Sequence, residues 1–408
     1  MKCRFCNNGL THVFIDLGNS PPSNAYLEAP LLNKVEMWYP LKIYVCEKCF
    51  LVQIDEYKKA TEIFDSAYAY FSSISKDWLT HAEKYTEKMI AEFGINMKSR
   101  VIEIASNDGY LLQYFKNNGI QVLGIEPTAS TAKVAIERGI ETIEEFFGVK
   151  LAEKLTAFGK KADLLLGNNV LAHVPDLNDF VSGLHLLLAQ EGMITMEFPH
   201  LLQLIEHNQF DTIYHEHFSY FSLTTVNSIF EEHGFELFHV EELSTHGGSL
   251  RIFAKHKGGM KNPLRDSVGT MLSKEKSAGI TTLEFYKGFE IKVAKVKLDF
   301  IEFLISAKKD GKKIAAYGAA AKGNTILNFC GIKNDWIDYV VDAAPSKQGK
   351  YLPGSHIPVV NEGVLRESKP DYVIIFPWNI KNEIINQLNY VREWQCKFVI
   401  LIPKMEII

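Results

Sequence analysis

The sequence predicts an α/β protein in which a small cysteine-bearing N-terminal domain precedes two Rossmann-like units. Cysteine pairs of the form C-x-x-C occur twice near the N-terminus. Short apolar strands alternate with amphipathic helices in the middle of the chain, and the alternation resumes near the C-terminus. Such alternation is typical of parallel sheets covered by helices. We expect domains at residues 1–60, 61–256 and 257–408, the second with an aromatic helical lead-in over 61–100 and the third opening with one linker helix.

The composition is that of an ordinary globular protein and excludes several classes of function. The chain has 408 residues, of which 47% are hydrophobic and 23% charged, with a formal net charge of −5. It contains neither a basic tract nor a run of 18 apolar residues, so we expect no nucleic-acid partner and no membrane span. Because the first residues form no apolar signal region and cysteines are few, we expect a cytoplasmic protein, as a monomer or weak homo-oligomer.

Four of the six cysteines predict a metal site in the N-terminal domain. They form two knuckles, Cys3-x-x-Cys6 and Cys46-x-x-Cys49. Each knuckle directs both sulfur atoms toward one point, and two knuckles complete the tetrahedral S4 geometry that Zn²⁺ prefers. Because cysteine occupies every ligand position, we expect structural zinc. Strand-like segments at residues 13–17, 42–45 and 51–54 accompany the knuckles.

The stretch at residues 101–112, V-I-E-I-A-S-N-D-G-Y-L-L, predicts a strand, a tight turn and the start of a helix. Small residues in the turn let a ligand approach the backbone closely. Backbone N–H groups and a positive dipole end face such a ligand at the top of a parallel sheet. The next strand ends on Glu126, where a βαβ unit places a carboxylate for two ribose hydroxyls. The pattern favours a nucleoside-containing ligand over an ordinary strand–turn–helix.

The turn favours S-adenosylmethionine over NAD. It lacks G-x-G-x-x-G, because its only glycine is Gly109, so a pyrophosphate finds no close backbone approach. S-adenosylmethionine has no phosphate, and Glu103 or Asp108 is available to balance its sulfonium charge. Further strands are predicted at residues 163–168 and 192–198, and their C-terminal ends face the same crevice. The expected cofactor-binding residues are Glu103, Ala105, Asn107, Asp108, Gly109, Tyr110, Leu111, Glu126, Asn168 and Asn169.

A dense group of titratable residues follows the last of these strands, in Tyr214-His215-Glu216-His217. Removal of a proton beside a carbonyl needs a base near neutral pKa and a donor that stabilises the enolate, and histidine and tyrosine suit these tasks. Alternatives are a zinc site on His215 and His217, or simple loop packing. His173, after the strand at 163–168, is either a crevice residue or a satisfied core histidine.

The C-terminal unit repeats the pattern of the central unit. A strand at residues 313–316 leads into the small-residue turn Y-G-A-A-A-K-G-N-T, and the strand at 339–342 ends on Asp342. A strand–turn–helix junction of this kind suits phosphate or nucleotide. We therefore expect Tyr317, Lys322 and Asn324 to contribute to substrate binding.

Taken together, these motifs resemble one family from end to end: the C-x-x-C pairs, E-I-A-S-N-D-G-Y, H-V-P-D, Y-H-E-H-F-S-Y-F-S, H-G-G-S-L-R and Y-G-A-A-A-K-G-N-T occur in its order. The family is that of the sugar C-methyltransferases acting on nucleotide-linked keto-deoxysugars, of the D-tetronitrose and mycarose type. The resemblance implies a class I S-adenosylmethionine methyltransferase domain between a zinc domain and a sugar-binding Rossmann-like domain.

The resemblance also implies roles for individual residues. His217 takes the place of the base, with Tyr214, Glu216 and His173 beside it. The tyrosine of the aromatic loop falls on Tyr68 or Tyr70, and His215 replaces an acid and receives no role. His246 and Arg251, in H-G-G-S-L-R, are assigned to the substrate.

The expected activity is S-adenosylmethionine-dependent C-methylation of a nucleoside-diphosphate-linked 4-keto-6-deoxysugar, through abstraction of an alpha proton, in branched deoxysugar biosynthesis. Two alternatives stay open. One is an O- or N-methyltransferase acting on the same kind of sugar, which needs no carbon acid. The other is a non-catalytic scaffold that binds zinc and S-adenosylmethionine.

Overall fold

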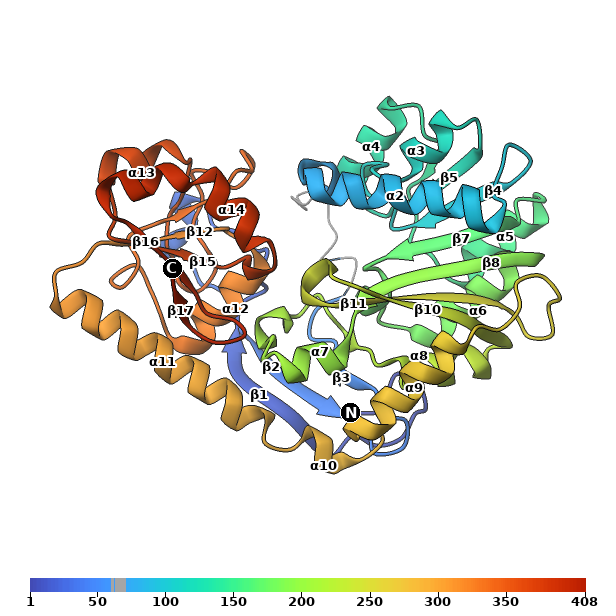
Figure 1. Ribbon diagram of the computed structural model, residues 1–408, viewed down its shortest axis with the longest axis horizontal. Helices are drawn as coiled ribbons and strands as arrows, with labels where there is room; N and C mark the ends of the chain where they lie inside the picture. The colour runs from blue at the N-terminus through green and yellow to red at the C-terminus, as the bar shows by residue number, and fades with distance from the viewer. Residues whose placement is uncertain (60–61, 63–70) are drawn as a thin grey trace.

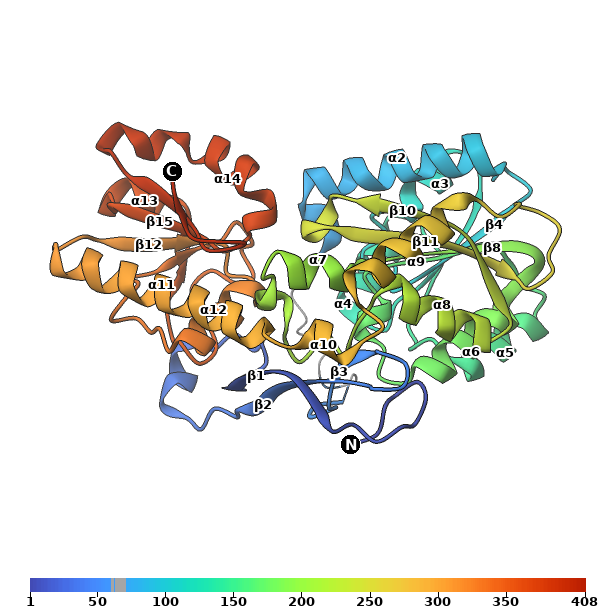
Figure 2. The ribbon, with the colours of Figure 1, turned by 60° about the horizontal axis from the view of Figure 1, so that its bottom comes forward.

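The computed structural model describes residues 1–59, 62 and 71–408. Its three sheets form an N-terminal, a central and a C-terminal domain. The central domain and the C-terminal domain stand side by side, and the N-terminal strands run beneath both of them (Figures 1 and 2). Among the described residues, no helix is both long and apolar enough to cross a membrane.

The N-terminal sheet is antiparallel, in the order β1-β2-β3-β9. The expected strands are confirmed as β1 (His12–Ser20), β2 (Tyr39–Val45) and β3 (Val52–Ile54). The fourth strand, β9 (Ser219–Tyr220), comes from the middle of the chain. The sequence pattern had not indicated this pairing, because it joins segments far apart in the chain.

The central sheet has seven strands, in the order β10-β11-β8-β7-β4-β5-β6. The parallel strands confirm the expected alternation, and β10 and β11 form an antiparallel edge. The strands are β4 (Arg100–Ile104), β5 (Gln121–Ile125), β6 (Thr142–Ile143), β7 (Ala162–Asn168), β8 (Leu188–Pro199), β10 (Phe235–Leu243) and β11 (Ser249–His256). Helices α2 (Lys76–Phe93), α3 (Leu112–Asn117), α4 (Ala129–Glu137), α5 (Val149–Ala157), α6 (Leu177–Leu187), α7 (Leu201–Glu206) and α8 (Leu223–Glu232) accompany them.

Helix α2 confirms that the lead-in expected over residues 61–100 contains a helix. The side chain of Ser75 accepts a hydrogen bond from the backbone of Trp78, and Gly94 ends the helix in the left-handed conformation. Its inner face buries Ala82, Tyr85 and Met89 against the central sheet, as the helical spacing predicts.

The prediction of a single linker helix over residues 257–310 is wrong. The segment forms three helices, α9 (Asp266–Ala278), α10 (Leu283–Tyr286) and α11 (Phe289–Lys309). Gly279 and Gly288 separate them, with φ angles of 98° and 78°. Glycine adopts this left-handed conformation at little cost, so the two glycines end one helix and redirect the chain into the next.

The C-terminal sheet runs in the order β14-β13-β12-β15-β16-β17 and is parallel apart from β17. Its strands are β12 (Ile314–Tyr317), β13 (Val340–Val341), β14 (Val359–Val360), β15 (Tyr372–Ile375), β16 (Lys397–Ile400) and β17 (Glu406–Ile407). Helices α12 (Ala321–Cys330), α13 (Gly363–Ser368) and α14 (Lys381–Gln387) complete the domain. One hydrophobic core runs from β1 and β2 through α11 into this sheet, so the N-terminal and C-terminal domains are packed together.

Candidate active site

A cavity of about 540 Å³ opens at the C-terminal ends of β4, β5 and β7. Its volume is in the range of small-molecule sites. Six of the expected cofactor residues line it: Ala105, Asn107, Tyr110, Glu126, Asn168 and Asn169. The cavity lining also includes residues without an expected role, among them Glu56, Lys59, Trp78, Pro127, Thr128, Phe146, Phe147, Asp176, Asp179 and Phe180.

The turn after β4 is held in an unusual backbone conformation. Ala105 and Asn107 have φ angles of 55° and 50°, in the left-handed region that residues other than glycine seldom adopt. The Glu126 carboxylate accepts hydrogen bonds from the backbone N–H of Asn107 at 2.9 Å and of Thr128 at 2.8 Å. Strain of this kind collects at ligand sites, and the bonds fix Glu126 on the cavity wall.

Four expected cofactor residues do not line the cavity: Glu103, Asp108, Gly109 and Leu111. Glu103 lies fully buried within β4, and burial raises the pKa of its carboxyl group well above the ordinary value. Asp108 instead accepts a hydrogen bond from Ser73 and pairs with Arg138 at 3.5 Å. The expectation that either carboxylate faces the sulfonium is therefore corrected.

The structure brings the rings of His173, Tyr214 and His217 together beside this cavity, and the backbone carbonyl of Glu216 contacts His173. The His217 ring centroid lies 4.7 Å from that of His173, which lines the cavity, and 4.0 Å from that of Tyr214. His217 Nδ1 lies 2.8 Å from the Thr212 carbonyl oxygen, and His173 Nδ1 lies 2.7 Å from that of Glu216. In each neutral ring Nδ1 therefore carries the proton and donates, and Nε2 is the acceptor nitrogen.

Burial sets the charge state of this cluster. It lowers the pKa of His173 to about 4, and it lowers the pKa of His217 well below its ordinary value, so both rings are neutral at pH 7. Burial raises the pKa of Glu216 to about 7. The Glu216 carboxylate accepts two hydrogen bonds from Asn24 Nδ2, at 2.7 and 2.9 Å, and these favour its ionised form.

The zinc alternative for the His-Glu-His segment is not supported. His215 Nε2 donates toward the Pro40 carbonyl oxygen at 3.2 Å, and its ring packs against Tyr39 and Tyr57. Among residues 1–59, 62 and 71–408, the four N-terminal cysteines form the one group with metal-ligand geometry.

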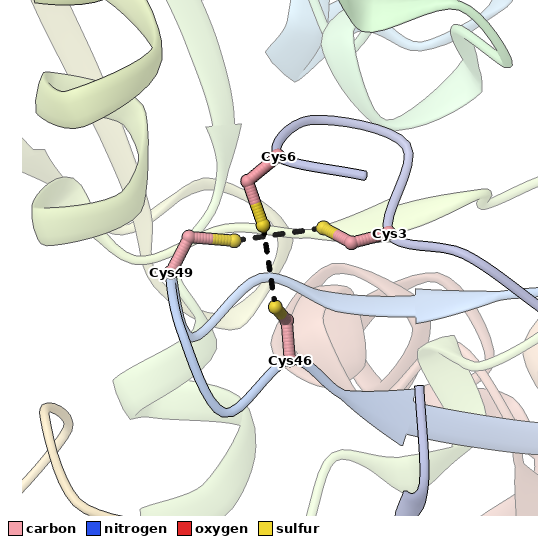
Figure 3. A group of neighbouring side chains, drawn as sticks. All are labelled: Cys3, Cys6, Cys46 and Cys49. Atoms are coloured by element: carbon pink, nitrogen blue, oxygen red, sulfur yellow. Dashed lines mark hydrogen bonds between the residues drawn. The ribbon is translucent and has the colours of Figure 1, made fainter. Parts of the chain in front are cut away.

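The four cysteine sulfur atoms converge on one point (Figure 3). All lie within 4.8 Å of one another, and the pairs Cys3–Cys49 and Cys6–Cys46 are 3.5 Å apart. A tetrahedral ZnS4 centre with Zn–S bonds near 2.3 Å separates its sulfur atoms by about 3.8 Å. Gln53 Nε2 donates to the Cys3 sulfur at 3.2 Å, a typical contact around a zinc thiolate. The residues fit structural zinc.

Comparisons with known proteins agree with this geometry. Family models match for a zinc binding domain at residues 3–64, a methyltransferase domain at 78–240 and a C-methyltransferase C-terminal domain at 244–403. The C-methyltransferase NovU of Streptomyces niveus is 32% identical over 407 residues, which cover 100% of this chain and 96% of NovU.

This chain belongs to the sugar C-methyltransferase family. The resemblance is confirmed, and the chain is an S-adenosylmethionine-dependent C-methyltransferase with structural zinc.

Solved structures are similar over less than half of the chain. The PH0226 protein of Pyrococcus horikoshii OT3 has 16% identity and a TM-score of 0.38, covering 46% of this chain and 95% of that protein. Magnesium protoporphyrin IX methyltransferase of Synechocystis PCC 6803, with bound S-adenosylmethionine, has 15% identity and a TM-score of 0.34, covering 44% and 79%.

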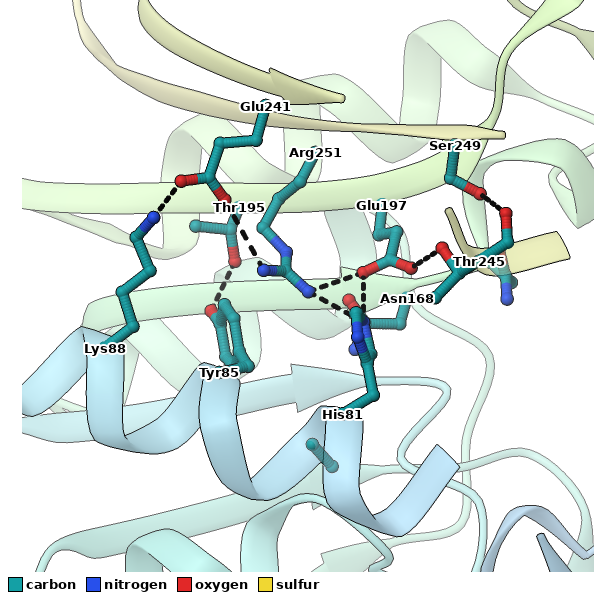
Figure 4. A network of polar contacts seen from close by, with 12 residues as sticks. His81, Tyr85, Lys88, Asn168, Thr195, Glu197, Glu241, Thr245, Ser249 and Arg251 are labelled. Carbon is teal, nitrogen blue, oxygen red and sulfur yellow. Dashed lines mark hydrogen bonds and ion pairs between the residues drawn. The ribbon is translucent and has the colours of Figure 1, made fainter. Parts of the chain in front are cut away.

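In this methyltransferase, Arg251 belongs to a buried ion-pair network rather than to the cavity wall (Figure 4). Its guanidinium contacts Glu197 at 2.6 Å, Glu241 at 3.6 Å and His81 at 2.9 Å, and lies 4.5 Å above the Tyr85 ring. These contacts join α2 to the central sheet. The expected substrate contact of Arg251 is therefore corrected, because its charge is already paired with two carboxylates.

His246 lies beside the cavity rather than in its lining. Its Nε2 is 2.6 Å from Asn169 Nδ2, and its ring packs edge-on against Trp78, 5.1 Å between centroids. Burial lowers the pKa of His246 to about 4. Trp78, on α2, lines the cavity; a helical pattern of apolar residues does not distinguish such a position from a core position.

The three C-terminal residues expected at the substrate have different surroundings. Lys322 Nζ donates to Asn379 Oδ1 at 2.7 Å and lies 4.3 Å from the Trp378 ring centroid. Tyr317 donates to Gln387 at 3.4 Å. Asn324 is fully buried and donates to the Ser23 carbonyl oxygen at 2.6 Å, so it joins two domains and the expected substrate contact is corrected.

The Lys322 ammonium faces the central domain across the interdomain boundary. Trp378, beneath it, donates from Nε1 to Asp211 at 2.6 Å, and burial raises the pKa of Asp211 to about 6. Besides burial, the positive charge of Lys322 contributes to the lowered pKa values of His217 and His246. The lysine therefore lies close enough to act on the histidine cluster. Tyr68 and Tyr70 lie outside the described residues.

Proposed function

We propose that the enzyme removes an alpha proton from a nucleoside-diphosphate-linked 4-keto-6-deoxysugar and transfers a methyl group to the resulting carbon nucleophile. The observation that carries this proposal is the tautomer of His217. Its Nδ1 proton is committed to the Thr212 carbonyl group, and Nε2 is left to accept a proton beside the donor cavity. O- or N-methylation of a sugar needs no carbon base of this kind.

In the first step, His217 Nε2 accepts the alpha proton and the C–H electron pair moves toward the carbonyl oxygen to give an enolate. Glu216, when ionised, stabilises the imidazolium through its negative charge. The buried aromatic side chains of Phe218 and Tyr220 exclude water from this reaction. Exclusion of water strengthens local electrostatics and protects the enolate from reprotonation.

Tyr214 is the better candidate of the two proposed enolate donors. The neutral His173 ring uses its Nδ1 proton on the Glu216 carbonyl oxygen, so Nε2 has no proton to donate. The Tyr214 phenol carries a proton, and its ring contacts that of His217. A neutral tyrosine donor is a common way to stabilise an oxyanion.

S-adenosylmethionine, when bound, supplies an electrophilic methyl group. Glu126 is proposed to hold the ribose hydroxyls, and Asn168 and Asn169 line the same cavity. The enolate carbon forms its new bond to the methyl carbon as the S–C bond breaks, and the imidazolium of His217 then loses its proton to solvent. The contribution of the protein is mainly to position the two reactants.

The nucleotide part of the sugar substrate is proposed to bind at the C-terminal domain, near Lys322 and Tyr317. Lys322 is a cation directed at the boundary with the central domain, where a diphosphate would be held while the sugar reaches His217. A lysine ammonium is a usual phosphate ligand.

The decisive experiment combines methyl transfer with exchange of the alpha proton. A panel of nucleotide-linked keto-sugars is incubated with the enzyme and S-adenosylmethionine, and products are identified by mass spectrometry. With the accepted sugar and S-adenosylhomocysteine, the native enzyme exchanges the alpha proton with deuterated solvent. His217→Asn is expected to lower kcat by about 10²–10⁴ and to abolish exchange, while donor binding is retained.

His215→Asn is the matched control, because it changes the neighbouring histidine that packs between tyrosines. A comparable loss in this variant would mean that the loop is disturbed rather than that a base is lost. Exchange at the native rate in His217→Asn would exclude His217, and its loss in Tyr214→Phe alone would indicate the tyrosine. Methyl transfer without exchange would favour an O- or N-methyltransferase, and donor binding without transfer would favour the scaffold alternative.

A further inference from the structure

The segment that carries His217 is built into the N-terminal sheet. Strand β9 begins two residues after His217 and pairs with β3, with Val52 opposite Tyr220 and Gln53 opposite Ser219. The Ile54 N–H also donates to the Phe218 carbonyl oxygen at 3.1 Å. A backbone ladder therefore fixes the residues directly after the proposed base to the cysteine-bearing domain.

Arg4, inside the first cysteine knuckle, contacts both histidine-bearing segments. Its guanidinium donates to the Pro175 carbonyl oxygen at 2.7 Å and to that of Ile54 at 2.5 Å. It also lies 5.4 Å from the centroid of the Phe218 ring. Pro175 follows His173 by two residues, and Phe218 follows His217 directly. One planar, five-donor side chain thus spans β3 and both segments.

Asn24, in the loop after β1, holds the third member of the cluster. Its Nδ2 lies 2.7 and 2.9 Å from the two carboxylate oxygens of Glu216. The positive charge of Lys58 also acts on Glu216, and the backbone carbonyl of Glu216 accepts the proton of His173. Asn24 is thus the side chain whose hydrogen bonds fix the orientation of this buried carboxylate.

We propose that the N-terminal zinc-binding domain is a positioning element of the active site, in which Arg4 holds the segments of His173 and His217 and Asn24 orients Glu216. This inference rests on the proposed catalytic roles of His217 and Glu216. Neither Arg4 nor Asn24 touches the reacting atoms, so both are positioning residues. The domain thereby affects turnover and not only folding.

The first test is Arg4→Gln, measured by zinc content, hydrogen–deuterium exchange and steady-state kinetics. We expect full zinc content, faster amide exchange in peptides covering residues 171–178 and 212–220, and a kcat lowered about 10- to 100-fold with unchanged affinity for S-adenosylhomocysteine. Arg4→Lys keeps the positive charge but lacks the planar, two-pronged guanidinium group. We expect it to show the same changes to a smaller extent. Native exchange and native kcat in both zinc-loaded variants would overturn the proposal for Arg4.

The second test compares Asn24→Ala with Glu36→Gln. Loss of the Asn24 donors disfavours the ionised form of Glu216, so its pKa rises and the acidic limb of the kcat profile moves to higher pH. Glu36 accepts hydrogen bonds from Gly354 and His356, so Glu36→Gln alters a contact of the same domain away from the cluster. A profile of Asn24→Ala that superposes on the native one would overturn its role.

The two tests keep this inference separate from the proposed reaction. Amide exchange in Arg4→Gln needs no sugar, and it reports the positioning of the two segments even if no keto-sugar is methylated. In that case the proposed function fails while the positioning role is still decided. Native exchange in Arg4→Gln together with active C-methylation would remove the positioning role and leave the proposed function intact.

Discussion

The central and C-terminal units share one local arrangement at the turn after the first strand, but only in the central unit does this turn border the cavity. In both, a carboxylate at the end of the second strand accepts a hydrogen bond from the backbone N–H two residues later, at 2.8 Å in each case: Glu126 with Thr128, and Asp342 with Ala344. The other oxygen of Glu126 then bonds the turn at Asn107, beside the cavity.

The other oxygen of Asp342 instead pairs with Lys347 at 3.3 Å, and the same ammonium donates to the Ala319 carbonyl oxygen in the turn after β12. Tyr26, from the N-terminal domain, donates to that carbonyl as well, at 2.5 Å. A lysine and a tyrosine from the protein itself thus contact this turn, whereas the corresponding turn of the central unit borders the cavity. The two units therefore share the same backbone arrangement of strand, turn, helix and carboxylate. The side chains around the turn determine whether it is accessible to a ligand or is covered by the protein itself.

The largest expected effect comes from Cys46→Ser, because structural zinc contributes about 10–16 kcal/mol of binding free energy that is coupled to folding. We expect the variant to lose zinc and the N-terminal domain to unfold at a lower temperature, as measured by metal analysis and thermal unfolding. If the Cys46→Ser variant still binds S-adenosylhomocysteine, the central unit forms its binding site for this ligand without an intact zinc domain. That result would sharpen the contrast between the central and C-terminal units. A native protein without zinc would contradict the assignment.

The second expected effect is acid sensitivity confined to the central unit. The buried rings of His173, His217 and His246 have lowered pKa values, so the folded state binds fewer protons than the unfolded chain. The associated stability is present above the unfolded pKa near 6.5 and is lost as the pH falls toward the folded-state pKa, which is about 4 for His173 and His246, at up to ~1.4 kcal/mol per histidine per pH unit. The C-terminal unit has one histidine, the partly exposed His356.

Hydrogen exchange at pH 7 and pH 5 measures this effect directly. Amides of the central sheet should lose protection at pH 5, whereas those of the C-terminal sheet should change little. An equal loss of amide protection in the central and C-terminal sheets would contradict the prediction that acid sensitivity is confined to the central unit.

The third prediction exchanges the paired acids. Glu126→Ala should weaken binding of S-adenosylhomocysteine by about 1.5–3 kcal/mol, the scale of hydrogen bonds to a charged group, with a smaller effect on turnover of the bound complex. Asp342→Ala is the matched variant and should leave this affinity unchanged. Calorimetry measures the affinity of both variants for S-adenosylhomocysteine. An unchanged affinity in Glu126→Ala would show that Glu126 is not at the ribose.

The smallest predicted effect concerns Lys322. Lys322→Ala should raise KM for the nucleotide-linked sugar by roughly 5- to 30-fold, corresponding to about 1–2 kcal/mol of a charged contact, and should leave donor affinity alone. Lys333→Ala, an exposed change on the same domain, is the control. A KM that does not move would mean that the lysine serves only its contacts with Asn379 and Trp378.

The sequence predicted local features well because short-range chemistry determines them. The strands around Glu126 and the convergence of four cysteines follow from patterns within a few residues and from metal-ligand geometry. It did not show that Glu103 is fully buried within β4 or that Arg251 pairs with Glu197 and Glu241, because the surroundings of a strand residue depend on segments that are distant in the sequence. The contacts of Arg4 and Asn24 could not be predicted either, since each joins segments that only the tertiary fold brings together.

Because β3 pairs with β9, the N-terminal sheet cannot be completed in the nascent chain until β9 has been synthesised. Protein synthesis proceeds at ~5–20 residues per second, so β9 emerges on the order of ten to thirty seconds after β3. Until then the edge of β3 that will receive β9 has no partner strand, and an unpaired edge invites pairing with other chains. Early capture of zinc by the cysteine knuckles would order β2 and β3 during that interval, and would give the nascent protein a defined edge on which residues 219–220 can later dock.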